Sequence, residues 1–117
     1  MTSLNFLNNN LFADGGKALA DALKGNNVMQ ELNISSNDLN YNSNYNLDMS
    51  GIIAISDAIP TMGALVKLLM AKNKIATKEA GEALGQALAK NSVLKELRLI
   101  YERSLTYLIS SILCEWV

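Results

Sequence analysis

The side chains that most often carry out catalysis are scarce in this chain. The sequence has no histidine and one cysteine, Cys114, which lies in an apolar stretch. A nucleophile therefore lacks the usual imidazole base, and no cluster of cysteine and histidine is available to hold zinc. Acidic residues such as Asp14, Asp21 and Glu82 are scattered over segments with helical periodicity, where solvated helix faces account for them. We therefore predict a protein that is not an enzyme and needs no cofactor or metal.

The pair Gly15 and Gly16 is the nearest approach to a phosphate-binding loop. It precedes the expected start of a helix, and a helix N-terminus attracts anions. The spacing G-x-x-x-x-G-K-[ST] is missing, however. We interpret the two glycines as a tight turn that leads into the helix.

One pattern, L-x-x-L-x-L-x-x-N-x-L, can be laid on the chain four times. The units begin at Met1, Met29, Leu65 and Leu94, which are 28, 36 and 29 residues apart. The longer step contains an Asn- and Ser-rich insertion, residues 40–50, which we expect to be a mobile loop whose residues cannot pack. Self-similarity at this period is typical of a solenoid, because one unit cannot bury its apolar face alone.

Each unit changes its apolar period halfway, which predicts a strand followed by a helix. The alternating L-x-L segments predict parallel strands over Ser3–Phe6, Glu31–Ile34, Lys67–Met70 and Glu96–Leu99. Spacings of three and four residues predict helices over Gly16–Lys24, Gly51–Ile59 and Thr77–Lys90. Thr77 is the expected N-cap of the third helix, and Gly25 and Pro60 are stop signals for the first two.

An asparagine recurs where the chain leaves each of the first three strands, at Asn9, Asn37 and Asn73. Its amide can satisfy backbone groups that the bend leaves unpaired, so we expect a structural role for it. Glu102 occupies the equivalent position in the fourth unit, which departs from the pattern there.

With these motifs the chain resembles leucine-rich-repeat proteins of the ribonuclease-inhibitor subtype, from Met1 to about Leu99. The resemblance implies an α/β horseshoe with strands on the concave side and helices on the convex side. The same repeat type occurs in nucleotide-binding immune receptors and in Ran GTPase-activating proteins. It therefore implies a module that binds proteins, with regulation of a small GTPase, or an inactive piece of a repeat receptor, as alternatives.

Alternate strand residues should face the concave side, where a partner would bind. The first row across the strands contains Glu31, Lys67 and Glu96, whose alternating charges either stabilise the stack or recognise a partner. The second row contains Asn5, Asn33, Leu69 and Arg98, with an apolar Leu69 facing solvent beside Arg98. These seven residues are the predicted partner-binding residues.

Composition limits the partners and the compartment. A chain of 117 residues builds one core, and a net charge of -1 disfavours nucleic acid and acidic membranes. A single cysteine allows no internal disulfide, and residues 1–10 lack the basic and apolar segments of a signal peptide. We therefore expect a protein partner, no membrane span, and a cytoplasmic or nuclear location.

The two ends of the repeat array raise separate expectations. Residues 1–103 form the repeats, and the apolar residues of 104–117 follow a helical period. We expect this segment to cap the array, with a membrane-surface or partner-binding helix as the alternative. Met1 already fills an apolar repeat position, so we also expect either a fragment of a longer array or self-association through uncapped ends.

Overall fold

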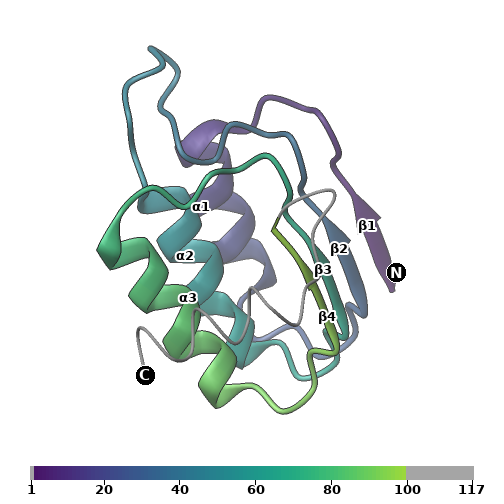
Figure 1. Cartoon of the computed structure of the whole chain (residues 1–117). Helices are drawn as coiled ribbons and strands as arrows, with labels where there is room; N and C mark the ends of the chain where they lie inside the picture. The colour runs from purple at the N-terminus through teal and green to yellow at the C-terminus, as the bar shows by residue number, and fades with distance from the viewer. Residues whose placement is uncertain (1, 100–117) are drawn as a thin grey trace.

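Four short strands lie side by side in one parallel sheet in the computed structural model, which describes residues 2–99 (Figure 1). They are β1 (Ser3–Asn5), β2 (Glu31–Asn33), β3 (Lys67–Leu69) and β4 (Glu96–Arg98). The spatial order follows the chain, β1-β2-β3-β4. Each strand begins where the sequence predicts it and ends one residue earlier. The predicted parallel pairing between successive units is confirmed, so the protein is a mixed α/β domain.

Three helices connect the strands and cover one face of the sheet (Figure 1). They are α1 (Phe12–Leu23), α2 (Ser50–Ala58) and α3 (Lys78–Lys90), and a 3-10 turn, η1 (Ile59–Thr61), extends α2 and contains Pro60. The Thr77 side chain accepts a hydrogen bond from the backbone N–H of Ala80 at 3.3 Å, which confirms the predicted N-cap. Gly25 follows α1 with a φ of +78°, a conformation that glycine adopts without strain.

The core lies between the sheet and the helices. The central residue of β2, β3 and β4 points toward the helices, and Leu32, Leu68 and Leu97 are at most 2% exposed. Leu4 of β1 is only partly buried against the same core. From the helix side come Ile52, Ile55 and Leu84. The alternation places the neighbouring strand residues on the opposite face of the sheet, away from the helices.

The interpretation of Gly15 and Gly16 as a turn before the helix is wrong, because α1 begins at Phe12 and contains both residues. Gly16 of α1 and Gly51 of α2 instead allow close packing between the two helices. A Cβ on Gly16 would lie 3.2 Å from the Cα of Gly51 in α2, and a Cβ on Gly51 would lie 2.8 Å from the Cα of Ala13. The two glycines thus let α1 and α2 approach each other more closely than larger residues would allow.

The insertion, residues 40–50, packs more than expected. Asn40 and Met49 are buried, with 4% and 8% of their surfaces exposed. The backbone N–H of Ala13 donates to the carbonyl of Tyr41 at 2.9 Å, and the rings of Phe12 and Tyr45 lie edge to face, 5.4 Å apart. The expectation that these residues cannot pack is therefore wrong for the two ends of the insertion, whereas residues 43–47 at its centre are exposed.

Candidate functional site

Two buried asparagines, in the turns that follow β2 and β3, each form hydrogen bonds to the preceding unit. The side-chain oxygen of Asn37 accepts the backbone N–H of Asn9 at 2.8 Å, and its amide donates to the carbonyl of Phe6 at 2.8 Å. Asn73 repeats this one unit further on, accepting from Asn37 at 3.1 Å and donating to the carbonyl of Ile34 at 2.7 Å. The predicted structural role is confirmed for both residues. Asn9 is exposed, so its amide adds less to the fold.

The first row of the open sheet face carries charge. The register aligns Ser3 with Glu31, Glu31 with Lys67, and Lys67 with Glu96. Lys67 Nζ lies 3.9 Å from Glu96 Oε2, and the Arg98 guanidinium lies 3.6 Å from the same oxygen. One carboxylate therefore lies between two cations at the β3–β4 corner. These side chains are 37% to 50% exposed, so each pair stabilises the fold by at most about 1 kcal/mol.

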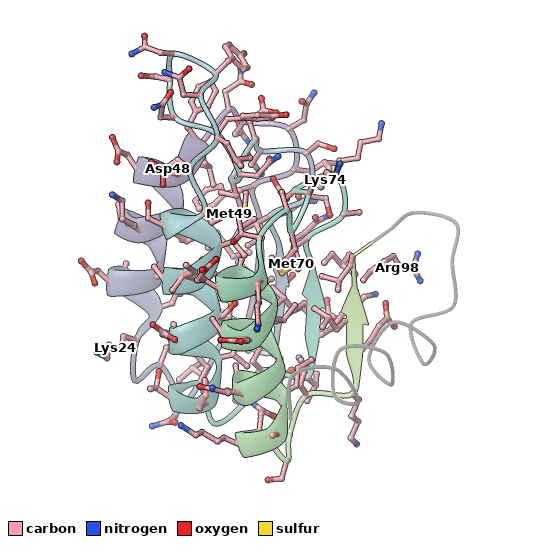
Figure 2. All side chains as sticks on the ribbon, turned by 60° about the vertical axis from the view of Figure 1, so that its left-hand side comes forward. Lys24, Asp48, Met49, Met70, Lys74 and Arg98 are labelled. Atoms are coloured by element: carbon pink, nitrogen blue, oxygen red, sulfur yellow. The ribbon has the colours of Figure 1, made fainter. Side chains whose placement is uncertain are left out.

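The second row contains Asn5, Asn33, Leu69 and Arg98, one residue from each strand. The register aligns these residues directly, as the sequence predicts. Asn5 and Arg98 are exposed, whereas Asn33 and Leu69 are half-buried. Leu69, which we expect to face solvent beside Arg98, is partly accessible on this face. Arg98 points away from the helix layer (Figure 2).

Alternation would place the next residues along the first three strands, Leu7, Ser35 and Ala71, in a third row on the same face, but two of them are buried. Ser35 is 3% exposed and Ala71 is 1% exposed, so neither is available to a partner. The Ser35 hydroxyl accepts the backbone N–H of Ala71 at 3.0 Å. Leu7 is 44% exposed at the β1 edge. Of these three residues, only Leu7 adds accessible surface to the first two rows.

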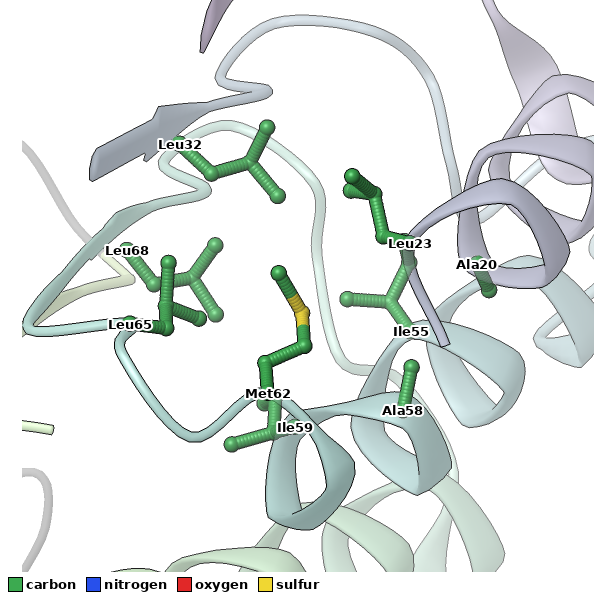
Figure 3. Close-up of a pocket in the computed structure, with 9 residues that line it drawn as sticks. All are labelled: Ala20, Leu23, Leu32, Ile55, Ala58, Ile59, Met62, Leu65 and Leu68. Carbon is green, nitrogen blue, oxygen red and sulfur yellow. The ribbon is translucent and has the colours of Figure 1, made fainter. Parts of the chain in front are cut away.

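A small apolar cavity lies inside the core, between the sheet and the junction of α1 and α2 (Figure 3). Its lining includes Leu32 of β2, Leu23 of α1 and Ile55 of α2, and the Met62 side chain extends toward its centre. No polar side chain lines it, so it has nothing with which to orient a ligand or hold a water molecule. It is a packing gap and not a binding site.

The described part of the chain contains no group of three or more side chains suited to holding a metal ion. Between residues 2 and 99 there is also no helix long and apolar enough to cross a membrane. Cys114, Glu102 and the proposed cap at 104–117 lie outside the described residues. The described side chains on the open sheet face offer hydrogen bonding, ion pairing and apolar contact.

No protein-family model and no curated protein matches this sequence. Among solved structures, the chain is similar to "Leiomodin-1 Actin-Binding Site 2 (ABS2)", with a TM-score of 0.64 and 19% sequence identity. The match covers 98% of this chain and 82% of that chain. At this identity the similarity shows a shared fold and nothing about the residues of a site.

Proposed function

We propose that this chain is a non-enzymatic module that binds a protein partner through the open face of its sheet. One observation carries the proposal. The helices all cover one face, and within residues 2–99 the opposite face leaves Asn5, Glu31, Arg98 and parts of their neighbours accessible. Charged, amide and apolar groups combined on one face suit contact with another polypeptide.

We also propose that the domain is a short leucine-rich-repeat solenoid of the ribonuclease-inhibitor subtype, with the open sheet face as its concave side. Repeated local geometry supports this assignment. Asn8, Ser36 and Lys72 hold equivalent positions in three successive turns and have φ values of 61°, 57° and 60°. The bonds of Asn37 and Asn73 repeat as well. Units that share one backbone conformation can stack on one another through the same contacts, as the repeats of a solenoid do.

Site-specific photocrosslinking tests the location of the interface. A benzophenone amino acid replaces Ser3, which is exposed on the open face beside Glu31, in one variant and Asp57, which is exposed on α2, in the other. Each variant is irradiated with a cell extract and with purified actin. Actin is included because the structural neighbour's name refers to actin binding.

We expect one dominant protein adduct from position 3 and none from position 57. Adducts from position 57 alone would contradict binding through the sheet. Stimulated GTP hydrolysis by a small GTPase crosslinked at position 3 would instead favour the alternative function, GTPase regulation.

A further inference from the structure

Two asparagines on the open face use their side-chain oxygen, but not their NH₂ group, in a hydrogen bond within the chain. The side-chain oxygen of Asn5 accepts the backbone N–H of Leu7 at 2.9 Å, and that of Asn33 accepts the N–H of Ser35 at 3.1 Å. Because only an oxygen can accept from an N–H, these bonds fix which way each amide points. The NH₂ groups of Asn5 and Asn33 have no hydrogen-bond partner among residues 2–99. Both asparagines therefore present donors to a partner.

The second row extends this donor character across all four strands. Neighbouring strands are about 4.8 Å apart, so the row from Asn5 to Arg98 spans about 14 Å, roughly the length of four or five residues of extended chain. Arg98 adds further N–H donors at the β4 end, where its side chain is 50% exposed. Half-buried Leu69 lies between the asparagines and the arginine. The row thus offers donors, one apolar contact, and no unengaged acceptor oxygen in its side chains.

The charged residues make the two ends of the second row differ in electrostatic character. Lys67 and Arg98 both lie near Glu96, which leaves one net positive charge at the β3–β4 corner. Glu31 is exposed two residues before Asn33 on β2 and places a negative charge toward the other end. A carboxylate on the partner is therefore favoured beside Arg98 and disfavoured beside Asn33.

We propose that the second row binds an extended segment of the partner that carries an aspartate or glutamate side chain. The carboxylate lies at Arg98, an apolar side chain contacts Leu69, and main-chain carbonyl oxygens accept from the amides of Asn33 and Asn5. This inference rests on the proposed function and specifies the chemistry of the partner. Charge-assisted bonds from the arginine and neutral bonds from the two amides give the segment one orientation.

A phage-displayed library of random 12-residue peptides, selected on the full chain, tests the proposal. Enriched peptides are synthesised, and their dissociation constants are measured by fluorescence anisotropy. The decisive variant is Asn33→Asp, which keeps the oxygen that accepts from Ser35 and replaces only the NH₂ donor. Asn26→Asp is the matched control, because the oxygen of Asn26 accepts from Val28 at 2.8 Å in the loop before β2, in a similar turn.

We expect enriched peptides to share an acidic residue near an apolar one. Arg98→Gln removes the bond to the partner's carboxylate, and Asn33→Asp removes a donor and adds a negative charge beside the peptide. Each change should weaken binding by about tenfold or more. Asn26→Asp should leave the dissociation constant within about twofold, because a change of that size is only a few tenths of a kcal/mol.

Other outcomes separate this inference from the proposed function. If Leu69→Glu abolishes binding but Asn33→Asp does not weaken it, or if the enriched peptides are not acidic, the donor chemistry is overturned and the open face remains the binding surface. If no peptide is enriched, or if binding survives all three changes in the row, both the inference and the proposed function are overturned.

Discussion

The side-chain oxygen of Asn73 accepts the backbone N–H of Asn37 at 3.1 Å, across 36 residues of sequence. It also accepts the N–H of Leu39 at 3.0 Å, and its amide donates to the carbonyl of Ile34. One buried side chain thus satisfies three backbone groups of the preceding unit. Through these bonds the asparagine fixes the position of one turn relative to the next, and so the register of the strands that form the open face.

Removing that amide should be costly. Asn73→Ala leaves buried donors and an acceptor without partners, and each unsatisfied group costs about 1–3 kcal/mol. We therefore expect the free energy of unfolding, measured in urea, to fall by about 2–5 kcal/mol. Asn9→Ala is the control. Asn9 is exposed, and its amide donates only to the carbonyl of Leu7, two residues earlier, at 3.1 Å. If Asn73→Ala lowered the free energy of unfolding no more than Asn9→Ala does, the bonds between units would not stabilise the fold as proposed.

The crossing of α1 and α2 should tolerate no added methyl group at Gly51. In Gly51→Ala the new Cβ would lie 2.8 Å from both the Cα and the carbonyl oxygen of Ala13, so one helix must shift. Overpacking of this kind costs about 1–3 kcal/mol, which thermal and urea unfolding would detect. Asp57→Ala, on the exposed side of the same helix, should change stability by less than about 0.5 kcal/mol. A Gly51→Ala protein as stable as the original would show that the helices have room to separate.

Leu32 should be among the most sensitive core positions. It is 2% exposed and lies beside the apolar cavity, so truncation to alanine enlarges an existing gap. Leu32→Ala should lower the free energy of unfolding by about 2–5 kcal/mol. Leu7→Ala, at a position that is 44% exposed, should have a much smaller effect. An unchanged urea midpoint for Leu32→Ala would contradict the assigned core.

Asp48 provides a pH-dependent contribution to stability. Hydrogen bonds from the Ser50 hydroxyl and the Ser50 backbone N–H lower the pKa of Asp48 from its ordinary value of 3.8. The folded state favours the ionised form of Asp48 more than the unfolded state does. The stability that this adds is therefore present above pH 4 and is lost as the pH falls through the lowered pKa. The stability difference between the original chain and Asp48→Asn should therefore shrink between pH 6 and pH 2.5. A difference that stays constant over this range would exclude a contribution from the ionised carboxylate.

The repeats made the sheet predictable, whereas the details of the site depended on contacts that a period cannot show. A period of two places Leu32 and Leu68 on one face and Asn33 and Leu69 on the other, and the structure agrees. The same period would place Ser35 on the open face, yet Ser35 is buried and its hydroxyl accepts the N–H of Ala71 in the next unit. The predicted helix starts at Gly16, whereas α1 starts at Phe12, because glycine disfavours a helix in isolation. In the folded chain, close packing of Gly16 against α2 outweighs that preference.

The most direct test of binding through the open face is a ¹H–¹⁵N correlation spectrum of the full chain, recorded as an enriched acidic peptide is added. The proposal predicts that the largest shifts occur in the side-chain NH₂ signals of Asn5 and Asn33 and in the Nε–H signal of Arg98. Backbone signals of the exposed helix residues Asp21, Asp57 and Lys90 should remain in place. Large shifts on the helices, with the amides of Asn5 and Asn33 unchanged, would contradict the account.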